Sequence, residues 1–170
     1  MNTTAPIQLV PGSTEADWHR HNNGGGWVYN KATVADSAYV GPDAAVYGNA
    51  LVFGNALVFG NALVSGNALV SGDSWVSGNA RVSGDALVFD NARVSGDALV
   101  FDNAQVFGNA WVAGDAWVAG NAEVFGNALV FDNAQVFGNA WVAGNEYVTG
   151  HAHVSGDALV SGCIVKSKNN

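Results

Sequence analysis

The stretch from Val52 to Leu69 reads VFGNALVFGNALVSGNAL, and it decides the fold. Its unit is six residues long, A-x-V-x-G-N, and the unit continues in both directions, because a valine stands at every sixth position from Val28 to Val160. A small residue, nearly always alanine, stands two positions before each valine, and the departures are Gly26, Ser74 and Glu146. Gly or Asp, followed by Asn or Asp, closes the units. An internal repeat of this regularity predicts a solenoid.

Within the unit, A-x-V-x alternates with period two, so Ala and Val face one way and the two x residues the other. Valine favours extended backbone, whereas Gly-Asn and Gly-Asp tolerate positive φ and turn the chain. About four extended residues and a two-residue turn, repeated without pause, are too short for an ordinary meander. The pattern therefore predicts a coil that bends in one sense, with Val and Ala filling a narrow interior.

Units such as Val52-Phe53-Gly54-Asn55-Ala56-Leu57 resemble the hexapeptide repeat of the left-handed parallel β-helix superfamily. The resemblance covers roughly residues 26–162. It implies a single-stranded, left-handed parallel β-helix with three hexapeptides per coil, hence about seven coils and a rod of about 35 Å. The lead-in Gly24-Gly25-Gly26-Trp27-Val28 is also similar to uncharacterised bacterial and phage-borne hexapeptide-repeat proteins.

The period divides the chain into three parts. Residues 1–25 have no hexad pattern and are expected to form an N-terminal cap or arm, residues 26–162 the solenoid, and residues 163–170 a C-terminal tail. Ile164, Val165 and Lys166 fall out of register, so the strand ladder is expected to stop near Gly162.

With three units per coil, one edge of the rod would stack Asn and Asp side chains: Asn49, Asn67, Asp85, Asn103, Asn121, Asn139 and Asp157. Stacked Asn amides can bond along the axis. The mixed Asp residues are expected to break such ladders through like-charge repulsion unless they are separated or hydrated.

The two x positions carry many large apolar side chains, which alternation places on the outside. Contiguous exposed apolar residues usually mark an interaction surface, although neighbouring Leu and Phe side chains can also cover one another. The candidate assembly surface consists of Phe53, Phe59, Phe89, Phe101, Phe107, Phe125, Phe131, Phe137, Trp75, Trp111, Trp117 and Trp141.

Exact internal copies indicate that the units are close to interchangeable. LVFDNAQVFGNAWVAG occurs at 99–114 and at 129–144, and RVSGDALVFDNA at 81–92 and 93–104. The first offset is five units and the second is two, and neither is a multiple of three units. On a three-sided rod each copy therefore lands on a different face.

Charge and cysteine content exclude several classes of function. The net charge is −8 with 6 Lys+Arg, so no cationic cluster is available for nucleic acid or anionic membranes. The single cysteine, Cys163, permits no internal disulfide. No signal peptide or membrane-spanning segment is recognisable at the amino terminus, so a cytoplasmic or virion-associated protein is expected.

Acyl transfer is the activity that the resemblance implies most directly, with a basic histidine near an acyl-CoA donor. Here the array has no inserted loop, and its only histidines, His151 and His153, are expected to be surface residues. A zinc site would need three converging ligands, and His19 and His21 lie about seven coils away in sequence. Repeated Gly-Asp pairs suggest turn chemistry rather than calcium. We therefore expect no catalytic residue, metal or cofactor.

These observations predict a non-catalytic structural protein that forms a homo-oligomer or filament through its apolar faces or coil ends. An acyltransferase-like trimer with an acyl-CoA donor is one alternative. A module that binds a glycan or another surface ligand, or a foreign protein, is the other, with stacking on Trp75, Trp111, Trp117 and Trp141.

Overall fold

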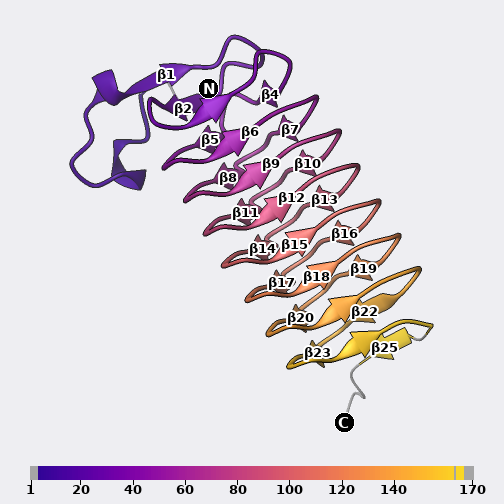
Figure 1. The fold of residues 1–170 in the computed structure, drawn as a ribbon. Helices are drawn as coiled ribbons and strands as arrows, with labels where there is room; N and C mark the ends of the chain where they lie inside the picture. Colours follow the sequence, from indigo (N-terminus) through magenta and orange to yellow (C-terminus); the bar gives the residue numbers. More distant parts are fainter. Residues whose placement is uncertain (1–3, 163, 167–170) are drawn as a thin grey trace.

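The computed structural model describes residues 4–162 and 164–166 and shows an all-β parallel β-solenoid of about 7 turns (Figure 1). The stacked turns run from the N-terminal segment at one end to β25 at the other. In the described residues the only helical elements are two 3-10 turns, η1 (Ile7–Leu9) and η2 (Glu15–Asp17). None of the described helices is long or apolar enough to cross a membrane.

Successive strands enter three sheets in rotation, so that every third strand pairs in parallel, as Trp75 does with Leu57 and Arg93. Sheet A contains β1 (Trp18–Arg20), β2 (Trp27–Tyr29), β5 (Ala45–Val46), β8 (Leu63–Val64), β11 (Arg81–Val82), β14 (Leu99–Val100), β17 (Trp117–Val118), β20 (Gln135–Val136) and β23 (His153–Val154). Sheet B contains β3 (Thr33–Val34), β6 (Leu51–Val52), β9 (Leu69–Val70), β12 (Leu87–Val88), β15 (Gln105–Val106), β18 (Glu123–Val124), β21 (Trp141–Val142) and β24 (Leu159–Val160). Sheet C contains β4 (Tyr39–Val40), β7 (Leu57–Val58), β10 (Trp75–Val76), β13 (Arg93–Val94), β16 (Trp111–Val112), β19 (Leu129–Val130), β22 (Tyr147–Thr149) and β25 (Ile164–Lys166).

The interior is the predicted column of valine and alanine. Every sixth valine from Val40 to Val148 is 0% exposed, and the alanines between them form the same core cluster. Because each valine pairs with the equivalent valine of the next turn, as Val58 does with Val76, identical side chains stack along the axis. Three residues take the alanine position without being alanine and are still buried: Gly26, Glu146 and Ser74, whose hydroxyl has no hydrogen-bond partner.

The hydrogen-bonded strands are mostly two residues long, shorter than the four expected from alternation. The ladder nevertheless continues into the turns, because Phe53 N–H donates to the Val70 carbonyl and Asn55 N–H to the Gly72 carbonyl. Gly54 has φ of 68°, and a Cβ there would lie 2.8 Å from the Gly72 carbonyl oxygen. Glycine is therefore needed for both the left-handed backbone and the close approach of successive turns.

Aspartate replaces this glycine at three positions and keeps the left-handed backbone: Asp90 (φ 60°), Asp102 (φ 59°) and Asp132 (φ 61°). Short polar side chains tolerate this region better than others do. In each case the carboxylate accepts the backbone N–H of the equivalent glycine in the next turn, at 3.2–3.3 Å. These bonds offset part of the strain that a Cβ introduces.

The N-terminal segment folds back onto sheet A. Strand β1 pairs antiparallel with β2, and Trp18 is 5% exposed in a cluster with Ala5 and Ala45. Tyr29 and Tyr47 pack around the Trp18 ring, with ring centroids 5.2 and 6.2 Å away. The segment therefore covers both the edge of β2 and part of the outer face of sheet A.

The segment also bonds to the edge of sheet C. Gly26 N–H donates to the Val40 carbonyl, and Val40 N–H donates to the Asn23 carbonyl. His21 is buried, and its Nε2 donates to the Ala38 carbonyl at 2.9 Å. Backbone groups at the start of both sheets are thus already occupied.

The expectation that strand pairing ends near Gly162 is wrong. Strand β25 pairs in parallel with β22, with Ile164 opposite Tyr147 and Val165 opposite Val148. The last turn is one residue shorter than the regular turns, so that Val165 takes the valine position. The buried carboxylate of Glu146 accepts the backbone N–H of Gly162 beside this shortened turn. Cys163 and residues 167–170 lie outside the described residues.

Candidate functional site

The predicted assembly residues point outward but do not form one surface, because the three sheets divide them. Sheet A carries Phe101, Phe137 and Trp117; sheet B carries Phe53, Phe89, Phe107, Phe125 and Trp141; and sheet C carries Phe59, Phe131, Trp75 and Trp111. Each residue follows or precedes an inward-facing valine of its strand, which fixes its direction. A period of six therefore spreads similar side chains over all three faces.

All four tryptophans of this set are exposed, with exposed fractions from 39% for Trp75 to 47% for Trp141. Phe53 and Phe137 are also exposed, and the other six phenylalanines are half-buried. Phe89, Phe107 and Phe125 on sheet B stack with ring centroids 4.9 Å apart and planes within 4°. These three rings thus cover one another, which is the alternative to an interaction surface that the sequence left open.

A diagonal contact organises the outer residues. A phenylalanine that follows one valine meets the aromatic ring that precedes the equivalent valine of the next turn, in edge-to-face geometry. The pairs are Phe59–Trp75, Phe101–Trp117, Phe125–Trp141, Phe131–Tyr147 and Phe137–His153. The residue after the valine is small in the units of Trp75, Trp111, Trp117 and Trp141, and these residues are Ser77, Ala113, Ala119 and Ala143. This pairing of a large and a small residue is readable in sequence as W-V-[AS]-G.

Sheet C presents a regular aromatic row. Trp75, Trp111 and Tyr147, exposed by 39%, 44% and 42%, stand before the valines of β10, β16 and β22. Arg93 and Leu129 occupy the intervening strands β13 and β19. The three rings are therefore two turns apart, which corresponds to about 10 Å. We call these three residues the aromatic row.

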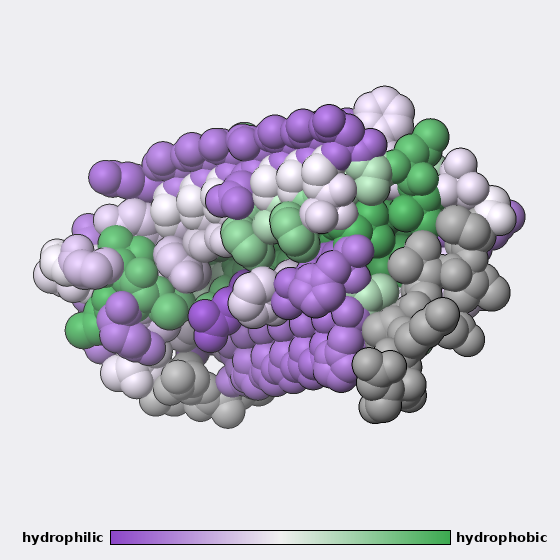
Figure 2. Space-filling view, turned by 90° about the horizontal axis from the view of Figure 1, so that it is seen from below, coloured by the Kyte–Doolittle hydropathy of each residue, from purple (hydrophilic) through white to green (hydrophobic). Residues whose placement is uncertain are grey.

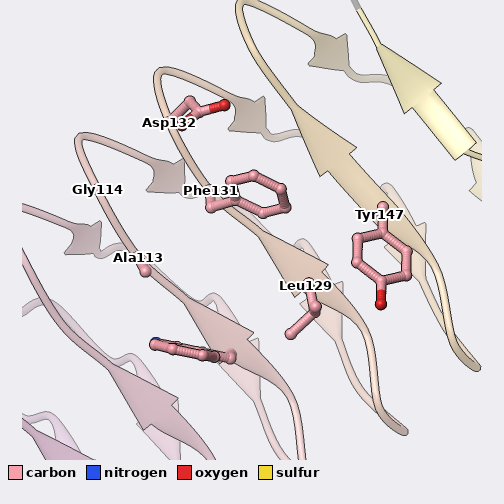
Figure 3. Close-up of a pocket in the computed structure, with 7 residues that line it drawn as sticks. Ala113, Gly114, Leu129, Phe131, Asp132 and Tyr147 are labelled. Atoms are coloured by element: carbon pink, nitrogen blue, oxygen red, sulfur yellow. The ribbon is translucent and has the colours of Figure 1, made fainter.

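A recess of about 390 Å³ lies between two members of this row. Its lining consists of Trp111, Ala113, Gly114, Leu129, Phe131, Asp132 and Tyr147. Leu129 pairs with Trp111 on one side and with Tyr147 on the other, so it lies between the two rings. Figure 3 shows the Leu129 and Tyr147 side chains on neighbouring turns, with the small Ala113 side chain on the turn before Phe131. Asp132 lies at the rim, where its carboxylate accepts the Thr149 hydroxyl at 2.7 Å. Such a recess suits a flat apolar group.

Polar contacts hold the rings of the row in place. The Arg93 guanidinium lies 4.6 Å from the centroid of the Trp75 ring, a cation–π contact. Trp111 Nε1 donates to the Ser95 hydroxyl at 2.9 Å. Neither Arg93 nor Tyr147 belongs to the assembly surface predicted from sequence. Both could be found from the sequence once every third unit is known to pair, because they then occupy the same outer position of sheet C as Trp75.

A second recess, on sheet A, repeats the pattern with polar walls. It has a volume of about 360 Å³ and is lined by Arg81, Ser83, Gly84, Leu99, Phe101 and Asp102. Here too a small residue, Ser83, lies in the turn before an L-V-F-D unit, which begins at Leu99. Arginine takes the place of the tryptophan, so this recess is less apolar.

The rod edges are polar. Figure 2 shows two hydrophilic rows running along the rod, with hydrophobic and near-neutral side chains between them. The predicted ladder forms along one edge: Asn49 donates to Asn67 and Asn67 to Asp85, and a second run leads from Asn103 through Asn121 and Asn139 to Asp157. In each of these bonds the donor is the residue nearer the N-terminus.

The histidines are divided between the two ends of the rod. His151 and His153 are exposed near the C-terminal end, and His153 lies edge-on to Phe137. His19 and His21 belong to the N-terminal segment. In the part of the chain that the structure describes, no three His, Cys, Asp or Glu residues cluster as metal ligands.

The fold and the repeated outer pattern define the chain as a parallel β-solenoid repeat protein. A model of the YdcK beta solenoid repeat matches residues 62–78, 75–89, 80–96 and 92–106, a stretch within the rod from β8 to β15. The comparison with curated proteins gave no match.

Proposed function

We propose that the chain is a non-catalytic structural protein that self-assembles through its exposed apolar surface. The observation that supports this proposal is the exposure of Trp75, Trp111, Trp117 and Trp141 by 39–47% on a rod whose interior is already filled. Large rings that add nothing to the core and face water cost solubility, and such surfaces usually mark interfaces.

Contacts through the faces fit better than stacking at the N-terminal end. Residues of the N-terminal segment already bond to the edges of β2 and β4. A second rod would have to displace these bonds before it could extend sheets A and C there. The outer faces of sheets B and C need no such displacement.

We further propose that the solenoid is left-handed with three hexapeptides per coil. The register between paired strands, in which every third unit pairs, supports the number of units. The hand is carried over from the hexapeptide-repeat resemblance.

The test is light scattering coupled to size-exclusion chromatography over a wide range of protein concentration. We expect a mass above that of the 17.5 kDa monomer, either fixed for a closed oligomer or growing for a filament. A monomer at every concentration would sink the proposal. A sharp trimer that also binds acyl-CoA saturably would favour an acyltransferase-like protein instead.

One observation favours a glycan-binding module as a second candidate. The recess between Trp111 and Tyr147 has aromatic walls and a carboxylate, Asp132, at its rim. Sugar rings stack on such walls and donate hydroxyl hydrogen bonds to carboxylates. Titration with oligosaccharides, followed by tryptophan fluorescence, distinguishes this function: saturable quenching that Trp111→Ala abolishes would support it.

A further inference from the structure

We infer that the outer face of sheet C is the interface between two copies of this chain, with a ring of the aromatic row of one copy seated in the recess of the other. The inference rests on the proposed self-assembly and names its surface. It is carried by three exposed rings on alternate strands of this face and by the recess over Leu129 between two of them.

The other two faces are less suited to a second copy. The N-terminal segment covers part of sheet A around Trp18, and Arg81 lies beside the recess farther along. On sheet B the rings of Phe89, Phe107 and Phe125 stack on one another and leave no gap between them. Glu123 adds a carboxylate to the same face. Two copies that each carry a net charge of −8 would therefore meet least favourably there.

Sheet C differs in charge, because the carboxylate at the rim of its recess, Asp132, already accepts the Thr149 hydroxyl and the Gly150 N–H. The outer positions of its strands from β4 to β22 contain one formal charge, that of Arg93, and it is positive. The guanidinium stacks on Trp75, so its charge faces an aromatic ring rather than water alone. A partner ring from the aromatic row could take the other side of Arg93.

The shape of the face is self-complementary. Trp75, Trp111 and Tyr147 rise on every second strand, while the recess over Leu129 and Ala113 lies one strand away from two of them. A second copy shifted by an odd number of turns therefore sets its rings against Arg93 and against the recess over Leu129 of the first. A twofold axis perpendicular to the rods allows this shift.

The available area is enough for a specific but modest dimer. About seven turns spaced by about 4.8 Å, with about five outward or turn residues across, give a face of about 35 by 16 Å. Two such faces bury about 1,100 Å² or more in total, which reaches the lower range of specific interfaces. An interface of this size is expected to form a dimer that exchanges with monomer rather than an obligate one.

The first test removes the rings. Trp111→Ser with Tyr147→Ser deletes both walls of the recess, and the control Leu159→Ser removes a side chain on sheet B that is 65% exposed and lies outside the predicted assembly surface. Sedimentation equilibrium should show a dimer dissociation constant at least about 30-fold higher for the sheet C pair, as expected for central aromatic anchors. The control should stay within about threefold of the parent. Circular dichroism melts confirm that all variants fold.

The second test fills the recess without removing a ring. Ala113→Phe introduces a side chain that this column already carries at Phe59 and Phe131, and Ala143→Phe makes the same change on sheet B. Only Ala113→Phe should weaken association. If the parent assembles and the sheet C variants behave like their controls, this inference fails while self-assembly stands. A parent that stays monomeric overturns both.

Discussion

At the scale of single residues, most positions obey the six-residue rule, and the exceptions carry the information. Ser74 occupies an alanine position, is 0% exposed, and its hydroxyl has no hydrogen-bond partner. The sequence shows that serine replaces alanine here, but it does not show that the serine hydroxyl lacks a hydrogen bond. In a wider interior the same hydroxyl could reach a backbone carbonyl. Here the carbonyls of the strand are engaged along the axis, as in the bond from Leu57 N–H to the Ser74 carbonyl.

Replacing Ser74 by alanine should stabilise the protein. The change removes a buried hydroxyl that lost its water without gaining a partner, a cost of about 1–3 kcal/mol. Ser74→Ala should therefore raise the free energy of unfolding by about 1 kcal/mol, measured as the urea midpoint at unchanged slope. Ser77→Ala, on the outer side of the same unit, is the matched control and should change it by less than about 0.5 kcal/mol. A lower midpoint for Ser74→Ala would contradict this account.

At the scale of the element, the repeating turns were predictable, but their bonding was only partly so. The ladder from Asn49 to Asp157 follows from the three-unit register. Aspartates were expected to break such ladders, and they do end runs of hydrogen-bonded asparagines. They do not leave the last asparagine amide unpaired, because Asn67 donates to Asp85 and Asn79 donates to Asp97. A carboxylate accepts well but cannot donate onward, so the next run starts afresh.

One edge of the rod carries carboxylates on two successive turns, at Asp97 and Asp115. The two turns are joined by backbone hydrogen bonds such as that from Asp97 N–H to the Gly114 carbonyl. Like charges opposite one another destabilise a sheet by a few tenths of a kcal/mol. Asp115→Asn relieves the repulsion and supplies a donor toward Asn133. We expect a gain of about 0.5 kcal/mol at low ionic strength that shrinks in molar salt.

The control is Asp157→Asn. Asp157 ends a run by accepting from Asn139, and the residue before it on its edge is this asparagine rather than a carboxylate. Its substitution should show little dependence on salt. Chemical unfolding of both variants at two ionic strengths decides the matter, and equal salt dependence would argue against repulsion at Asp115.

The diagonal contacts could not be predicted from alternation alone. Alternation says only that Phe59 and Trp75 both face outward. Their contact across successive turns depends on how far the phenylalanine ring leans toward the next turn. The W-V-[AS]-G pattern marks where there is room for this lean, as at Trp75 and Ser77.

At the scale of the whole molecule, the all-β solenoid and its inward valines and alanines followed from the sequence because one period governs the whole rod. The division of the outer residues among faces needed the pairing of every third strand as well. The N-terminal segment does not share the period. Its docking on sheet A depends on long-range packing of Trp18 that no local pattern encodes.

That docking can be tested through Trp18. Trp18→Ala removes the ring that Tyr29 and Tyr47 surround, and loss of a buried tryptophan costs about 3–5 kcal/mol. Because the rod has its own core, we expect the segment to detach while the solenoid stays folded. Limited proteolysis should cut the chain before Trp27 faster, and a hydrophobic dye should bind the uncovered face of sheet A.

Trp117→Ala, an exposed position on the same sheet, should leave both signals unchanged. If Trp18→Ala instead melts the entire rod, the segment is part of the folding unit rather than a cover over one face.

The uniform direction of the asparagine bonds gives the rod an electric polarity. Each bonded side-chain amide points its N–H toward the C-terminal end, and the carboxylates of Asp73, Asp85, Asp97 and Asp157 lie at the positive ends of their runs. The aligned amides add as peptide dipoles do along a helix. The dipoles of two rods side by side therefore favour an antiparallel over a parallel arrangement, a preference that fades as salt screens it.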